Sequence, residues 1–368
     1  MKTKARVIAL YLPQYHPIPE NDEFWGKGFT EWVNVAQSRP LFKGHYQPQI
    51  PADLGFYDLR MPEIREMQAK LAQEAGIEGF MYWQYYFGEK KMLLEQPFEE
   101  VLKSGKPDFP FCLGWANHSW RTLTWKRDAS HQNGKTIIME QKYAGIQQYI
   151  DHFMYNLPAF KDSRYIKVNG KPFFAIWNPN DHSSEIKEMI TIWQKLAIEN
   201  GFPGIHFVAQ EVFHVSNQSI FKLGFNAIYQ NKILESQTKI TSNFKWRLRH
   251  MLINKLGITK FLDKYDFEKL SPYLVTNEAK EENIYPTLLA GYDRSPRAGK
   301  KAIILYNFTP KTWHQHIKNV LSYVMHKNYE ERIIMLKSWN EWGESNYMEP
   351  DRKYGHQKLD ALHDEIVI

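Results

Sequence analysis

Eight short apolar runs recur along the chain with helical patterns between them, and this alternation constrains the fold more than any other feature. The runs cover residues 6–12, 79–85, 109–115, 172–177, 206–210, 227–230, 287–291 and 333–338. Several are rich in β-branched or aromatic residues and are bounded by Gly, Pro or Asn, as is typical of buried parallel strands.

Three of the intervening segments have a clear helical period. Apolar side chains fall on one face of residues 61–75, 185–199 and 309–326. In the first segment, Ile64, Met67 and Leu71 share that face. Strands with helical crossovers predict an α/β fold, here a single (β/α)8 TIM-type barrel, and a doubly wound open sheet is the alternative.

The chain of 368 residues contains no internal repeat, Pro-rich linker or low-complexity tract. We therefore expect one catalytic barrel domain over residues 1–368. Two connections are long, residues 13–60 after the first strand and residues 231–283 after the sixth, the second being a basic helical insertion. Long loops in compact domains are usually functional or disordered, and the aromatic content of the first favours order.

The formal net charge of +6 lies in one segment, where seven basic residues between Lys239 and Lys264 face the single acid Asp263. The rest of the chain is neutral, which argues against a nucleic-acid partner. A basic amphipathic helix is predicted here, capped by Ser242 and stopped by Gly257, with the apolar stripe Phe244, Leu248, Met251, Leu252 and Leu256. The stripe either packs on the barrel or rests on anionic lipid, giving peripheral membrane contact through residues 239–264.

Cys112 is the only cysteine, so the sequence predicts neither a disulfide framework nor a thiolate metal cluster. The apolar start of the chain meets Pro13 without a small-residue cleavage site, and we interpret it as a strand and not a signal peptide. No apolar run approaches the length of a membrane span. These features predict a cytoplasmic protein, in contact with the inner face of the membrane if the basic helix binds lipid.

Polar and aromatic residues crowd the ends of the predicted strands, where a barrel builds its active site. The aromatic fraction is 15%, and flat aromatic faces suit sugar rings, although a bulky core also uses them. The residues predicted to bind substrate are Tyr11, Gln14, His16, Trp25, Glu31, Trp32, His45, Tyr82, Trp83, Trp115, Asn117, Trp120, Trp177, Glu211, Asp293, Arg294, Trp339, Asn340 and Trp342. We assign no metal and no cofactor, and place Arg294 and Arg297 as the basic residues near the rim.

The eighth strand runs directly into two carboxylates, Glu341 and Glu344, which a turn from Asn340 can place on one side of a cleft. Glycoside hydrolysis needs two carboxyl groups, one protonated to assist departure and one ionised. Packing against Trp339 and Trp342 would raise one pKa by desolvation and separate the two roles. Glu341 and Glu344 are therefore the predicted catalytic residues.

Six short segments form a pattern that spans nearly the whole chain, at residues 11–16, 25–32, 43–48, 53–58, 115–117 and 339–344. Together they resemble the WbsX-like family of bacterial polysaccharide-cluster proteins. That family is similar to glycoside hydrolase family 99, the endo-α-mannosidases, which are (β/α)8 barrels. The hydrolase sequence has His where this chain has Gly343.

The resemblance implies roles for both glutamates. Glu341 would be the general base that activates the substrate's own 2-hydroxyl, and Glu344 the general acid. An anhydro-sugar intermediate and retention of configuration would follow. The implied partner is an oligo- or polysaccharide, lipid-linked if it is a precursor.

Three functions remain open at this point. The first is a retaining endo-type glycosidase acting on a surface polysaccharide of O-antigen or capsule type. The second is a glycosyltransferase of polysaccharide biosynthesis, which usually needs a diphosphate-holding basic cluster or an Asp-x-Asp metal site, and no Asp-x-Asp is present. The third is a carbohydrate-binding protein without catalysis, which would not need the pair Glu341 and Glu344.

Overall fold

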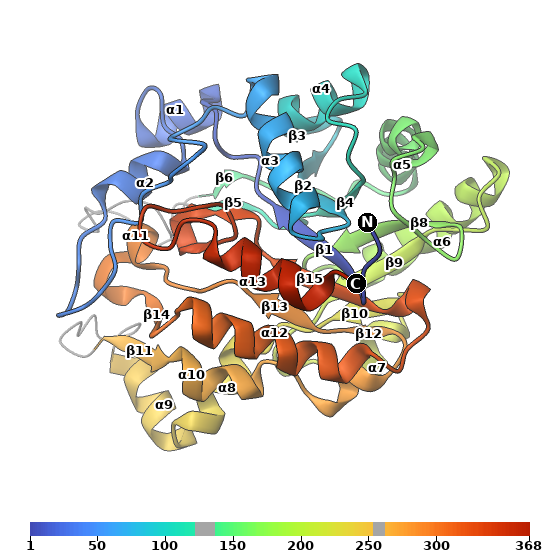
Figure 1. The fold of residues 1–368 in the computed structure, drawn as a ribbon. Coiled ribbons are helices and arrows are strands. Elements are labelled where there is room, and N and C mark those ends of the chain that lie inside the picture. Colours follow the sequence, from blue (N-terminus) through green and yellow to red (C-terminus); the bar gives the residue numbers. More distant parts are fainter. Residues whose placement is uncertain (122–136, 253–261) are drawn as a thin grey trace.

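The computed structural model describes residues 1–121, 137–252 and 262–368 (Figure 1). Nine parallel strands form a nearly closed barrel, in the order β12-β10-β9-β8-β4-β2-β1-β15-β13. Their bounds are β1 (Arg6–Tyr11), β2 (Gly79–Gly88), β4 (Phe111–Trp115), β8 (Lys171–Ile176), β9 (His206–Gln210), β10 (Ala227–Tyr229), β12 (Ile284–Tyr285), β13 (Thr287–Leu289) and β15 (Ile333–Lys337). The predicted (β/α)8 barrel is confirmed, and each of the eight predicted strands is present.

The ninth strand, β12, lies just before the predicted run 287–291 and outside the eight predicted strands. Pro286 separates β12 from β13, and proline has no N–H to donate to a sheet. β12 pairs with β10, whereas β13 pairs with β15, so this one segment reaches both ends of the sheet. The Pro286 carbonyl still accepts a hydrogen bond from Met335 N at 3.0 Å. The barrel therefore has eight strand positions, of which one is interrupted.

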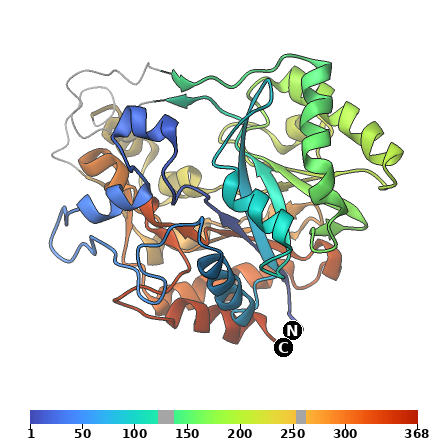
Figure 2. The same cartoon turned by 90° about the horizontal axis from the view of Figure 1, so that it is seen from above.

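Helices surround the barrel, as Figure 2 shows from above. Their bounds are α1 (Pro19–Trp25), α2 (Glu31–Gln37), α3 (Pro62–Glu74), α4 (Gln96–Ser104), α5 (Ile146–Lys161), α6 (Ser183–Glu199), α7 (Asn217–Phe221), α8 (Ile233–Ile240), α9 (Asn243–His250), α10 (Phe267–Leu270), α11 (Ser295–Ala298), α12 (Pro310–Val324) and α13 (Gln357–Ile366). The shorter strands are β3 (Lys91–Leu93), β5 (Trp120–Arg121), β6 (Ile137–Met139), β7 (Lys167–Val168), β11 (Asp263–Asp266), β14 (Ile303–Tyr306), β16 (Asn340–Glu341) and β17 (Asn346–Tyr347). None of the helices in the described residues is long and apolar enough to cross a membrane.

The predicted helical segments are confirmed, but one of their faces was assigned wrongly. The apolar face of α12 is buried as expected, from Trp313 to Val324. In α3, Met67 is 43% exposed, and the buried positions include Gln68, Ala69 and Ala72. The buried face of α3 differs from the predicted one because Gln68 points inward and makes buried hydrogen bonds with Tyr11 and Glu349. The spacing of apolar residues cannot predict a buried polar side chain.

The first long connection folds over the carboxyl ends of the strands and contains α1 and α2. A buried carboxylate, Glu349, ties it to the barrel. Glu349 accepts hydrogen bonds from Tyr57 OH at 2.9 Å, Gln68 Nε2 at 2.6 Å and Trp342 Nε1 at 2.6 Å. These donors come from the connection, from α3 and from the turn after β15, so one side chain joins three parts of the site.

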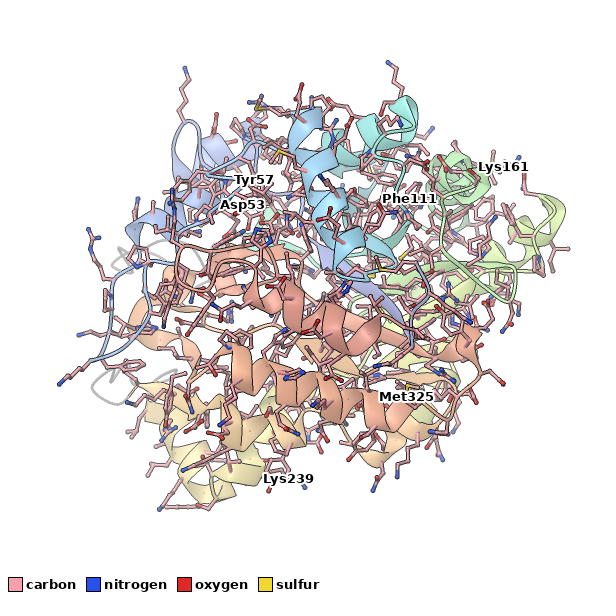
Figure 3. The ribbon with its side chains drawn as sticks, viewed as in Figure 1. Asp53, Tyr57, Phe111, Lys161, Lys239 and Met325 are labelled. Carbon is pink, nitrogen blue, oxygen red and sulfur yellow. The ribbon has the colours of Figure 1, made fainter. Side chains whose placement is uncertain are left out.

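The second long connection contains α8, α9, β11 and α10. It shares a small apolar cluster with the barrel, in which Ile233, Phe267 and Leu270 meet Leu289 of β13. Lys239, at the end of α8, lies at the lower edge of the molecule in Figure 3, away from Asp53 and Tyr57 of the first connection. Parts of the basic segment, including Lys255, Leu256, Gly257 and Lys260, lie outside the described residues.

Glu349 generates a testable pH dependence of stability. Burial raises the pKa of Glu349 to about 7, whereas an unfolded Glu titrates near about 4.3. The folded state therefore keeps a proton that the unfolded chain releases, and this contribution is lost as the pH rises through about 7. We expect the wild type to lose stability relative to Glu349→Gln between about pH 4 and 7, by at most about 1.4 kcal/mol per pH unit. Urea unfolding at several pH values measures it.

The exposed Glu63→Gln variant controls for the loss of one carboxylate. Glu349→Gln itself should be less stable by about 1–3 kcal/mol, because one buried donor loses its acceptor. Stability differences that stay constant over the pH range would contradict this account of Glu349.

Candidate active site

A cleft of about 500 Å³ opens at the carboxyl ends of the barrel strands. This volume lies within the range of small-molecule sites, and the position is where (β/α)8 barrels carry their active sites. Both predicted catalytic residues line it. Of the predicted substrate-binding residues, the structure brings the following to the same cleft: Gln14, Trp25, Trp83, Trp120, Trp177 and Arg294.

The turn that carries the two glutamates is fixed by the end of β1. Asn340 Oδ1 accepts from Leu12 N at 2.8 Å, and Asn340 Nδ2 donates to Leu12 O at 3.0 Å. The Tyr15 hydroxyl donates to the Asn340 carbonyl and accepts from Trp342 N. The Asn340 side chain thus pairs with the Leu12 backbone in the way that a residue of a neighbouring strand would. This explains why an Asn precedes Glu341.

One guanidinium contacts both predicted catalytic carboxylates. Arg297 Nη1 lies 3.1 Å from Glu341 Oε1 and 2.8 Å from Glu344 Oε1. On its other edge, Arg297 Nη2 lies 3.1 Å from Glu31 Oε1, and Nε donates to Glu31 Oε2 at 3.2 Å. Arg294 Nε adds a second cation at 3.1 Å from Glu344 Oε1.

These contacts give the two glutamates unlike electrostatics. Burial and the like charge of Glu344 raise the pKa of Glu341, and Arg297 opposes this only in part. Burial alone would raise the pKa of Glu344 too, but Arg297 and Arg294 outweigh it and hold that pKa below its usual range. Two carboxyl groups with pKa values moved apart are the arrangement that general acid–base catalysis needs.

Glu31 supports the site from behind and does not reach the cleft. The side chain is fully buried and is held by Arg297. A Cβ at position 343 would overlap Glu31 Oε2 and crowd Arg297 Nε. The contact between Glu31 and Arg297 therefore requires a residue without a side chain at position 343.

Aromatic side chains form the walls of the cleft. Trp25, Trp83, Trp120 and Trp177 line it. The His118 ring packs on Trp177 with centroids 4.5 Å apart, and burial lowers the pKa of His118 to about 4, so this ring is neutral at pH 7. Flat apolar faces combined with neutral polar groups suit the faces and hydroxyls of sugars.

The other predicted substrate-binding residues do not line this cleft in the described part of the chain. They are Tyr11, His16, Glu31, Trp32, His45, Tyr82, Trp115, Asn117, Glu211, Asp293, Trp339, Asn340 and Trp342. The main reason is strand alternation, because neighbouring side chains on a strand point to opposite faces. Leu10 and Leu12 face the cleft, so Tyr11 points outward and donates to Gln68 at 2.7 Å.

Several of these residues hold the site together from outside the cleft. Trp32 packs against Trp342 at 5.6 Å. Trp115 is buried and donates to the Tyr86 carbonyl at 2.8 Å, and the Asn117 amide bridges to the backbone of Asn178. These side chains are structural because their polar atoms are already paired in the core.

Two charged residues that were predicted to bind substrate form ion pairs outside this cleft. Glu211 forms a buried ion pair with Lys232. Asp293 pairs with His45 at 2.7 Å, and both residues line a neighbouring cavity of about 240 Å³.

The cleft also contains residues that the sequence did not single out for substrate binding. They are Asn21, Tyr85, His118, Ser119, Gln210, Asn231, Tyr292, Arg297 and Lys337. Gln210, Asn231 and Lys337 lie at strand ends, so position alone could have identified them. Asn21 and Arg297 come from connections, where no periodic pattern predicts orientation. The described residues contain no group of three or more His, Cys, Asp or Glu side chains that could hold a metal ion.

The steric condition at position 343 is testable. Gly343→Ala should displace the Glu31 carboxylate and destabilise the fold by about 1–3 kcal/mol, as overpacking of a buried site does. In a Glu31→Ala background the overlapped atom is gone, so the same change should cost much less. Chemical unfolding of the two single variants and the double variant gives the coupling energy. Additive costs would show that Gly343 and Glu31 do not interact as described.

Comparison with known proteins places this chain in a family. A family profile described as "Glycosyltransferase WbsX" matches residues 7–362. Two relatives described as "Uncharacterized protein WxcX", from Xanthomonas campestris pv. campestris strains B100 and ATCC 33913, are each 31% identical over 360 residues. The match covers 97% of this chain and 49% of each relative, so the chain spans about half the length of these proteins.

Among solved structures, a family 99 endo-α-mannosidase from Bacteroides thetaiotaomicron aligns with a TM-score of 0.57 and 13% identity, over 99% of this chain and 96% of that one. A structure described as a glycoside hydrolase-like protein aligns with a TM-score of 0.59 and 15% identity, over 99% of this chain and 94% of that one. These likenesses show a shared fold. The family match extends over nearly the entire chain, and the chain therefore belongs to the WbsX family.

Proposed function

We propose that this protein is a retaining endo-type glycoside hydrolase. Its substrate would be a bacterial surface polysaccharide of O-antigen or capsule type, or a precursor, with α-mannoside-like linkages as the first to test. The observation that carries the proposal is the pair Glu341 and Glu344, two carboxylates with unlike electrostatics at the floor of an aromatic-walled cleft. The fold shared with a family 99 endo-α-mannosidase supports it.

The reaction follows from two carboxyl groups and the substrate's own 2-hydroxyl. One carboxylate removes the 2-hydroxyl proton as O2 bonds to C1, while the other carboxyl group protonates the departing glycosidic oxygen as its bond to C1 breaks. The second group, now ionised, then takes a proton from water, whose oxygen bonds to C1. The C1–O2 bond breaks and O2 recovers its proton from the first group. Two inversions at C1 retain the configuration.

Glycosyl transfer is the second candidate, because the matching family profile is described as a glycosyltransferase. A transferase would bind a nucleotide diphosphate, and among the described residues the cations that line the cleft are Arg294, Arg297 and Lys337. Arg294 and Arg297 already contact carboxylates, which favours hydrolysis. A binding protein without catalysis is the third candidate. The unlike environments of the two glutamates argue against it.

The two glutamates give the direct test of function. Incubation with intact polysaccharide should release shorter glycans, and incubation with nucleotide sugars should transfer none, as read by NMR of the products. Glu341→Gln and Glu344→Gln should each lower the rate by about 10²–10⁴, the usual contribution of a general acid or base. Product NMR also reports whether the configuration at C1 is retained.

The matched control is Glu188→Gln on the exposed side of α6, which should turn over like the wild type. Sugar transfer from a nucleotide donor without hydrolysis would establish the transferase. Unchanged rates in both cleft variants, with the fold intact, would remove Glu341 and Glu344 from the mechanism.

We further propose that the protein rests on anionic lipid at the inner face of the cytoplasmic membrane. The Ser242 side chain caps α9 by accepting from Lys245 N. On this helix Phe244 is 75% exposed and Leu248 39%, and Met251, the residue that follows the helix, is 42% exposed. These apolar side chains face solvent beside the exposed Lys245 and Arg247, which favours a lipid-facing stripe over one packed on the barrel.

Vesicle sedimentation tests the lipid proposal. The protein should sediment with anionic vesicles at low salt and not with neutral ones. Replacing Lys245 and Arg247 by Gln should weaken binding about 30-fold, since each basic residue near such a surface contributes about 1 kcal/mol. Lys187 and Lys195 of α6 are exposed, and their double Gln variant is the matched control. Equal recovery with neutral and anionic vesicles would exclude this surface.

A further inference from the structure

We infer that the cavity lined by His45, Tyr292 and Asp293, the side cavity, is a second carbohydrate site that takes a sugar residue bearing a carboxylate. This residue would belong to the glycan proposed above as substrate, so the inference rests on the proposed function and makes that glycan an acidic one. The side cavity measures about 240 Å³, and Tyr292 lines both it and the catalytic cleft. Sites for drug-sized ligands measure about 300–1,000 Å³, so this smaller space suits a single sugar ring.

Aromatic side chains form much of the wall of the side cavity. They are Tyr46, Tyr292, Tyr306, Phe308, Tyr347 and Tyr354. Gly44 and Asn307 also line the side cavity and are exposed, so it opens to solvent. Flat aromatic faces pack against the apolar face of a sugar ring, and tyrosine hydroxyls can bond to its hydroxyl groups. The size and the wall of the side cavity therefore favour a carbohydrate.

Asp293 is one of two aspartates that line the side cavity in the described part of the chain, and both of its oxygens are bonded. Its Oδ2 accepts from Gln47 Nε2 at 2.7 Å and lies 2.7 Å from His45 Nε2. Its Oδ1 accepts from Ser295 N at 2.8 Å. Asp293 thus joins the first long connection to the segment after β13, and its charge is stabilised within the protein.

Asp351, the other aspartate, is bonded in a similar way. Its Oδ1 accepts from the backbone N–H groups of Lys353 and Tyr354, both at 2.8 Å. Its Oδ2 accepts from Tyr347 OH at 2.8 Å. Because these donors stabilise both carboxylates, neither aspartate requires a hydroxyl group or a cation from a ligand.

The buried lysine of the side cavity is less completely partnered than the aspartates. Lys358 is 3% exposed, and its Nζ donates to the Tyr347 carbonyl at 2.7 Å. Its ion pair with Asp351 Oδ2 is long, at 3.8 Å. Burial lowers the pKa of Lys358 to about 7, although Asp351 and Glu349 oppose this shift. An ammonium group has three N–H donors, so Lys358 has a donor available for an acceptor in the side cavity.

Two exposed lysines add positive charge at the rim of the side cavity. Lys353 Nζ lies over the rings of Tyr46 and Tyr354, 4.6 Å and 4.7 Å from their centroids. Lys264, at the end of the basic segment, lies over the ring of Tyr306 at 5.5 Å. Ring faces attract these ammonium groups without using their N–H donors. A carboxylate on the bound sugar would accept charge-assisted hydrogen bonds from such donors, which a neutral sugar cannot do.

Methyl NMR tests the inference without requiring turnover. The intact protein is labelled with ¹³C at the methyl groups of Leu and Ala and is titrated at pH 6 with methyl glucuronide, methyl glucoside and acetate. Leu305 lines the side cavity and Ala116 lines the cleft, so their signals report the two sites separately. We expect methyl glucuronide to shift the Leu305 signals and to bind at least about tenfold more tightly there than methyl glucoside or acetate.

Variants of the lysines identify the groups that bind the carboxylate. Lys358→Met should weaken methyl glucuronide binding at Leu305 by about tenfold or more, because a buried charge-assisted hydrogen bond is lost. Lys353→Gln should weaken it about two- to fivefold, since an exposed ion pair contributes less. Lys353 is exposed, so this variant keeps the test decisive if Lys358→Met fails to fold. Lys187→Gln on the exposed side of α6 is the matched control and should leave the affinity unchanged.

Several results would overturn the inference. Equal affinity for methyl glucoside would remove the requirement for a carboxylate, and equal affinity for acetate would show an anion site that does not recognise a sugar. Shifts of Ala116 without shifts of Leu305, or no shifts with any probe, would also exclude a sugar site in the side cavity. The expected binding in a protein that cleaves no glycan would instead refute only the proposed hydrolase.

Discussion

The parallel pairing of β1 with β15 is the contact on which the rest of the site depends. It aligns Arg6 with Ile333 and Ala9 with Leu336, and so joins the first strand of the chain to the last strand of the barrel. Because both strands run the same way, their carboxyl ends emerge together. Leu12 can then bind Asn340, and the connection after β1 can deliver Glu31 beneath the turn after β15. Because β1 and β15 are neighbours in the sheet, residues from the two ends of the sequence lie together in one site.

Much of this architecture could be predicted from the sequence, because parallel strands buried on both faces appear as continuous apolar runs. The strand His206–Gln210 was predicted to the residue. The two glutamates could be predicted because they follow the last strand directly. The side-chain direction of the aromatic residues could not, since apolar runs lack the alternation that marks an inward face. Tyr82 and Trp83 are neighbours within β2, and only Trp83 lines the cleft.

The arginine network could not be predicted for a different reason. Glu31, Arg297 and Glu344 lie on three separate connections, and no short spacing links them. The glycine at position 343 could have indicated that another buried group lies beside the turn. A chain that lacks a side chain present in a related motif often makes room for another group. The structure identifies that group as the Glu31 carboxylate. Buried charges require partners, so a buried acid in a long connection implies a cation that packs beside it.

The two ends of the chain lie side by side near the start of β1 (Figures 1 and 2), whereas the cleft lies at the carboxyl ends of the barrel strands. Lys4 N donates to Ile366 O at 2.8 Å, and Ile368 N donates to Lys2 O at 3.0 Å. β1 then runs the full depth of the barrel before its end contributes to the site. A tag, a reporter or a second module joined to either terminus would therefore project from the base of the barrel and leave the entrance for a long glycan unobstructed. Linking the two termini and opening the chain elsewhere is also geometrically permitted, which makes this barrel a candidate for circular permutation.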